Sequence, residues 1–133
     1  MNPEAIIPLI ITSATAFYDL LTKRRDIASA RQKAIGELFT IIADTLQKAV
    51  DEFKIGKIPH GACAELGHYA ANLSSTLYGV LPDEKVQYYG NMLIQAHNVE
   101  MLALTLTENR EMQLADLERA AGIFRGIATT IKL

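Results

Sequence analysis

The sequence has little of the chemistry on which many small proteins depend. Cys63 is the single cysteine among 133 residues, so no disulfide can form within the chain. The chain has thirteen lysines and arginines and fifteen acidic residues, and Lys23-Arg24-Arg25 is its single basic cluster. This balance lacks the basic footprint of a nucleic-acid-binding protein. The first residues, Met-Asn-Pro-Glu, lack the positive segment of a secretory signal, so we expect a cytoplasmic protein with no nucleic-acid partner.

No stretch alternates apolar and polar residues for long enough to predict a β-strand. The four prolines fall at 3, 8, 59 and 82, which leaves long uninterrupted segments. In those segments apolar residues recur at steps of three and four, which is typical of amphipathic helices. Half of the residues are hydrophobic, which is enough for one domain with its own core.

The pattern predicts a single all-α domain over 1–133. An apolar N-terminal helix is expected within 1–25, followed by an antiparallel up-down-up-down four-helix bundle over 26–133. Three cations followed by Asp26 favour a break between the first two helices. Beyond it, helices are predicted over 26–53, over 60–80, from Pro82 to about 106, and from a capping box at Thr105 and Glu108 to the C-terminus.

The N-terminal helix is more apolar than one buried stripe requires. Residues 5–21 carry one charge, Asp19, but are slightly short of the roughly 20 residues that span a bilayer. Because one groove on the bundle would not bury all of these side chains, we expect them to contact a partner. The predicted contact residues are Ile6, Ile7, Ile10, Ile11, Phe17 and Leu21.

Small residues at intervals of four predict a second contact surface on the third helix. Gly67, Ala71, Ser75 and Gly79 continue a series that begins at Cys63. Such a small-residue ridge lets another helix approach closely. The neighbour is either the N-terminal helix or another copy of the chain, and both alternatives stay open.

Two spacings resemble metal-ligand motifs. Glu65 and His68 form Glu-x-x-His, and His97 and Glu100 repeat the pair in reverse order on the next helix. His68, however, faces away from the bundle axis on a helical wheel. A metal-binding four-helix bundle is therefore a secondary alternative, and we expect no metal or other cofactor.

Charged residues on apolar helix faces predict polar contacts inside the bundle. Glu100 lies in an apolar stripe, where a carboxylate needs a partner, and Arg110 is expected to pair with it beside His97. Arg31 raises the same question, with Asp83 or Glu84 as the expected partner.

No nucleophile with its base, phosphate loop or strong ligand set is present, so the sequence indicates a non-enzymatic protein. Cys63 and His60 lie three residues apart, but nothing marks a third catalytic group. The leading interpretation is a helical protein-interaction or self-assembly module that binds a protein partner or itself, as a homo-oligomer.

The alternative interpretation is a membrane-active bundle whose N-terminal helix inserts into or permeabilises a bilayer. Lys23, Arg24 and Arg25 would then contact anionic head groups. The layout is similar to that of membrane-permeabilising domains of the HeLo and MLKL type, and that resemblance implies membrane association. Thr12 and Asp19 favour a partly solvated protein interface over a bilayer core.

Overall fold

The computed structural model describes residues 6–24, 26–95 and 110–132, and this part of the chain is helical with no strand. The all-α prediction is therefore confirmed. In chain order the elements are α1 (Ile6–Thr22), α2 (Ser29–Lys54), α3 (His60–Ala71), α4 (Leu73–Thr76), α5 (Asp83–Ile94) and α7 (Arg110–Lys132).

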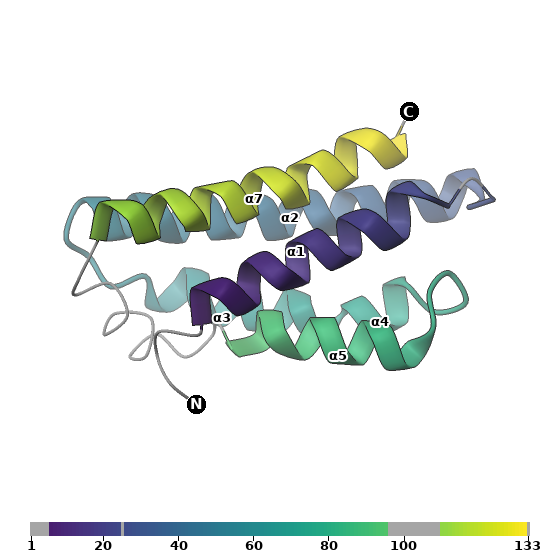
Figure 1. The fold of residues 1–133 in the computed structure, drawn as a ribbon, viewed down its shortest axis with the longest axis horizontal. Coiled ribbons are helices and arrows are strands. Elements are labelled where there is room, and N and C mark those ends of the chain that lie inside the picture. The colour runs from purple at the N-terminus through teal and green to yellow at the C-terminus, as the bar shows by residue number, and fades with distance from the viewer. Residues whose placement is uncertain (1–5, 25, 96–109, 133) are drawn as a thin grey trace.

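The longest helices lie along the long axis of the molecule (Figure 1). α7 packs along α2, and α1 packs against both α7 and α5. α1 and α7 run in the same direction, while α2 runs the opposite way (Figure 1). α3, α4 and α5 form the other side of the molecule, so α1 is covered on two flanks.

The break between the first two helices is confirmed. α1 ends at Thr22, whose hydroxyl donates to the Tyr18 carbonyl at 2.6 Å, and α2 begins at Ser29. Between the helices the Arg24 guanidinium pairs with the Asp26 carboxylate at 3.2 Å. Lys23, Arg24 and Asp26, three of the charges that favoured a break in the sequence, therefore lie in the connection itself.

The prediction of one helix over 60–80 is wrong, because α3 ends at Ala71 and the short α4 follows Asn72. The Asn72 amide donates to the Tyr69 carbonyl at 3.1 Å, and the Ser75 hydroxyl donates to the Asn72 carbonyl at 3.1 Å. A Ser hydroxyl that bonds to a nearby carbonyl in this way competes with the helical hydrogen bonds, and Asn has a low intrinsic preference for a helix interior. Gly79 then adopts a left-handed φ of 78°, which ends the helical course.

The C-terminus of α2 is closed by a Schellman motif. The Lys57 amide donates to the Glu52 carbonyl at 2.9 Å, and the Gly56 amide donates to the Phe53 carbonyl at 3.1 Å. Gly56 occupies the left-handed position that this motif requires, with φ 79°. Arg110 of α7 also donates to the Phe53 carbonyl, which ties the start of α7 to the end of α2.

Arg31 performs a similar role at the opposite end of α2. Its Nη2 donates to the Thr76 carbonyl at 2.9 Å and to the Tyr78 carbonyl. The expected partners Asp83 and Glu84 are exposed, so the arginine meets backbone oxygens rather than an acid. These bonds attach the turn after α4 to the first turn of α2.

Aromatic side chains join four helices at the centre of the core. Phe39 of α2 stacks on Phe124 of α7, with ring centroids 5.9 Å apart, and contacts Phe17 of α1 at 5.6 Å. Phe17 also meets Tyr89 of α5 edge-on at 6.2 Å. The three phenylalanines are fully buried. α1 therefore shares one hydrophobic core with the rest of the chain.

Phe39→Ala should lower the free energy of unfolding by about 3–5 kcal/mol, because it removes the ring that contacts both Phe17 and Phe124. Urea denaturation measures this loss. Ile41→Ala is the matched control, since Ile41 lies on the same helix and is 40% exposed. A loss at Phe39 no larger than at Ile41 would contradict the central role of this ring.

Arg31→Met should cost about 1–2 kcal/mol, because it keeps the aliphatic stem but removes the donors to the Thr76 and Tyr78 carbonyls. Amide hydrogen exchange should rise in residues 76–81. Lys33→Met, at an exposed position of the same helix, should leave that exchange unchanged.

Candidate functional site

The structure places the predicted contact residues of the N-terminal helix inside the protein. Ile6, Ile7, Ile10, Phe17 and Leu21 are each at most 3% exposed, and Ile11 is partly buried against the same core. In this fold a partner cannot reach the buried five. The surface that α1 offers is its opposite face.

The predicted ridge on the third helix is not one continuous surface. Cys63 is buried and Gly67 is half-buried, whereas Ala71 and Ser75 are exposed. Ala71 ends α3, Ser75 belongs to α4, and Gly79 lies in the following turn. Because Asn72 interrupts the helix, the four-residue spacing does not align these residues along a single axis.

The predicted polar residues do not form a site in the described part of the chain. Lys23 and Arg24 are exposed, and Arg25 lies outside the described residues. His97 and Glu100 also lie outside them, so the expected polar cluster with Arg110 is not tested. Glu65 and His68 are exposed on α3. Within the described ranges no three His, Cys, Asp or Glu side chains gather to hold a metal ion.

The Cys63 thiol is buried at 1% exposure in α3. Burial, with a smaller contribution from the Glu52 carboxylate, raises its pKa from an ordinary value of 9.0 to about 11. A thiol with this pKa stays protonated at neutral pH, whereas nucleophilic cysteines need the thiolate. Cys63 therefore behaves as a small apolar residue.

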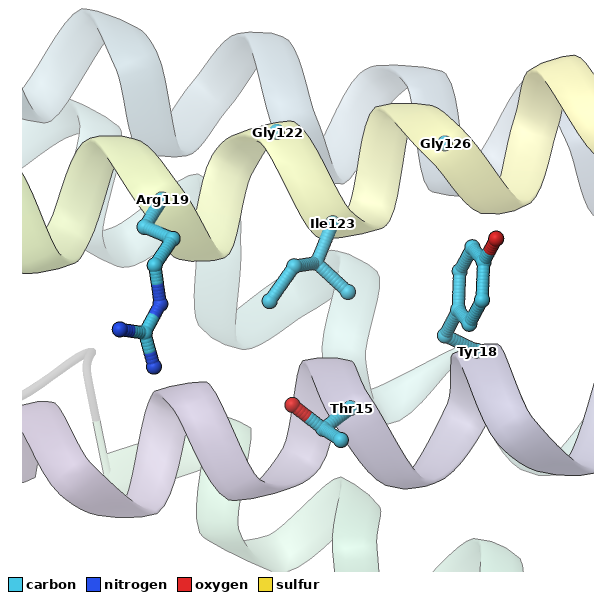
Figure 2. A pocket seen from close by; sticks show the side chains of 6 residues that line it. All are labelled: Thr15, Tyr18, Arg119, Gly122, Ile123 and Gly126. Atoms are coloured by element: carbon cyan, nitrogen blue, oxygen red, sulfur yellow. The ribbon is translucent and has the colours of Figure 1, made fainter.

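An open groove of about 520 Å³ lies between α1 and α7 (Figure 2). Its lining is mostly apolar and comes from two helices that are far apart in the sequence. The lining residues are Thr15 and Tyr18 of α1 and Arg119, Gly122, Ile123 and Gly126 of α7. This groove is the candidate functional site.

The groove is open because α7 presents two glycines there. A Cβ atom at Gly126 would lie 3.5 Å from Cε2 of Tyr18, which is an ordinary contact. A Cβ atom at Gly122 would meet nothing within 4 Å, so the space above it is empty. Tyr18 stands at one end of the groove and is 38% exposed (Figure 2).

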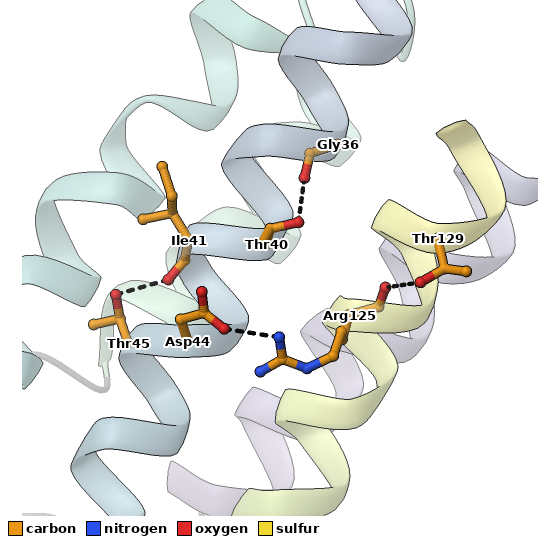
Figure 3. A network of polar contacts seen from close by, with 7 residues as sticks. All are labelled: Gly36, Thr40, Ile41, Asp44, Thr45, Arg125 and Thr129. Carbon is orange, nitrogen blue, oxygen red and sulfur yellow. Dashed lines mark hydrogen bonds and ion pairs between the residues drawn. The ribbon is translucent and has the colours of Figure 1, made fainter. Parts of the chain in front are cut away.

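Polar contacts to α2 hold α7 in place beside the groove. The Asp44 carboxylate accepts from Arg125 at 2.7 Å (Figure 3), and Lys54 pairs with Glu118. Exposed pairs of this kind contribute little stability, typically below about 1 kcal/mol. Their positions at separate points of α2 and α7 nevertheless favour one register between the two helices. The groove face of α7 is therefore left free of α2.

The sequence analysis did not predict this groove, although the spacing of two of its lining residues could have indicated it. Gly122 and Gly126 have the same small-xxx-small spacing that was noticed on the third helix. Their neighbour across the groove, Tyr18, is about a hundred residues away, and helical periodicity does not show which helices are adjacent.

Comparisons with protein-family models, with curated proteins and with solved structures found no match for this chain. Among the described helices, none combines the length and apolar character of a membrane span.

The stability of the protein should fall between about pH 9 and pH 11, because the unfolded chain then loses the Cys63 proton that the folded chain keeps. This group alone should cost about 2 kcal/mol near pH 11. Urea unfolding at neutral pH and near pH 11 measures the change. The free energy of unfolding of Cys63→Ala should decline less between these two pH values, because the other titrating groups are the same in both proteins. Equal declines would contradict the assignment of this pH effect to Cys63.

Proposed function

We propose that this protein is a non-enzymatic helical module that works by packing against other helices, with self-assembly as its main mode. The groove between α1 and α7 is the docking surface. The observation that supports this proposal is the open space above Gly122, beside apolar side chains that the fold leaves accessible.

The chemistry of the groove suits a helix as the occupant. Glycines on α7 allow a second backbone to come close, and Ile123 and Tyr18 supply apolar area. Thr15 and the tyrosine hydroxyl are compatible with the wetter edges of such an interface. In this proposal the helices that follow α1 form an antiparallel up-down four-helix bundle, and α1 is the additional helix that completes the docking surface.

Release of α1 into a bilayer is disfavoured by the core. Before it reached the bilayer, a detached α1 would expose to water five side chains that are now buried: Ile6, Ile7, Ile10, Phe17 and Leu21. At about 1.5–3 kcal/mol each, the total is on the order of 10 kcal/mol. Native domains have only about 5–15 kcal/mol of stability, so a bundle without α1 would hardly stay folded.

Gly122→Leu should abolish self-assembly without harming the fold. A Leu side chain would occupy the groove, while its Cβ meets no neighbour and its helix propensity exceeds that of glycine. Light scattering should give a mass above 14.6 kDa for the wild type and the single-chain mass for the variant. Gly61→Leu is the matched control, because a Cβ at this exposed α3 position also meets nothing within 4 Å.

Two results would overturn the proposal. A wild type of single-chain mass at every concentration would contradict self-assembly, and an unchanged oligomer in Gly122→Leu would exclude the groove. Leakage from anionic liposomes, measured on the same samples, provides a further check. Leakage by the wild type at its single-chain mass would support the membrane-active alternative.

A further inference from the structure

The two ends of the groove differ in their chemistry. Arg119 of α7 lies at one end and Tyr18 of α1 at the other (Figure 2). Asp19 follows Tyr18 directly in α1 and is exposed. A cation therefore lines one end of the groove, and an aromatic ring lines the other; the residue after that ring in the chain is an exposed carboxylate outside the groove lining.

Neither of these charges is paired among the described residues. The ion pairs there join Arg24 to Asp26, Lys54 to Glu118, and Asp44 to Arg125. Two charges of α7, Glu118 and Arg125, are thus paired with charges of α2. Arg119 and Asp19, beside the groove, have no ion-pair partner in the part of the chain that the structure describes.

We propose that the occupant of the groove is a second copy of this chain, docked groove against groove about a two-fold axis. This inference rests on the proposed function and adds the partner and its orientation. In a two-fold interface, if one residue contacts another, the reciprocal contact also forms. Arg119 of each copy then meets Asp19 of the other, and its guanidinium lies against the Tyr18 ring.

The charges select an antiparallel orientation of the two copies. From Arg119 to Gly126 the helix rises about 10 Å, so the two ends of the groove are electrostatically distinct. Parallel docking would place the two Arg119 side chains together, whereas antiparallel docking brings each beside the opposite charge. Because a two-fold contact closes on itself, the product is a dimer rather than a filament.

Charge reversal tests this orientation. Arg119→Glu alone would set two glutamates against two Asp19 side chains, and Asp19→Arg alone would set arginine against arginine. Each variant should weaken the dimer at least tenfold. An equimolar mixture of the two should restore it, since both contacts between unlike variants are then attractive. The double variant, which reverses both charges, should dimerise by itself.

Sedimentation equilibrium of these four samples, beside the wild type and Gly122→Leu, gives the dissociation constants. Circular dichroism of each variant checks that the helices persist. Dimerisation of the mixture with weak association of either single variant supports the pairing. The pairing of Arg119 with Asp19 is overturned if the charge variants all dimerise as tightly as the wild type. If Gly122→Leu is monomeric in the same experiment, self-assembly through the groove is still supported, but without this orientation. A wild type of single-chain mass contradicts both ideas.

Discussion

The contact of Phe39 with two other phenylalanines is the interaction on which the arrangement of the long helices depends. Phe39 stacks on Phe124 and touches Phe17, so one side chain of α2 fixes both α7 and α1. Because α1 is held there, its outer face lies beside α7 and the groove forms between them. The surface proposed for assembly is thus a consequence of how the inner face of α1 packs in the core.

Helical periodicity predicted the all-α class and the break after α1, because both depend on local features: the spacing of apolar residues and the charges around Asp26. It did not predict the division at Asn72, where the Ser75 hydroxyl bonds to the Asn72 carbonyl although the apolar pattern continues on both sides. The burial of the apolar side chains of the N-terminal helix in the core was also not predicted. Periodicity shows which side chains are apolar, but not that α5 and α7 would cover two flanks of α1.

The candidate site was less predictable than the fold, since it is composed of residues from the first and last helices. Gly122 and Gly126 could have been noticed by their spacing, whereas their juxtaposition with Tyr18 depends on long-range packing. Arg31 and Arg110 show the same limit. Both were expected to meet acids, and in the described structure both donate to carbonyl groups near helix ends, which sequence patterns do not identify as partners.

Gly122 lies well inside α7, where glycine lowers helix stability by about 1 kcal/mol relative to alanine. A methyl group would fit at this position without touching anything. The isolated chain would thus be more stable with alanine, and its own packing gives no reason for the glycine. The residue is one that the folded chain tolerates at a cost in helix stability, and the side chain that it lacks is what keeps the groove between α1 and α7 open at this point.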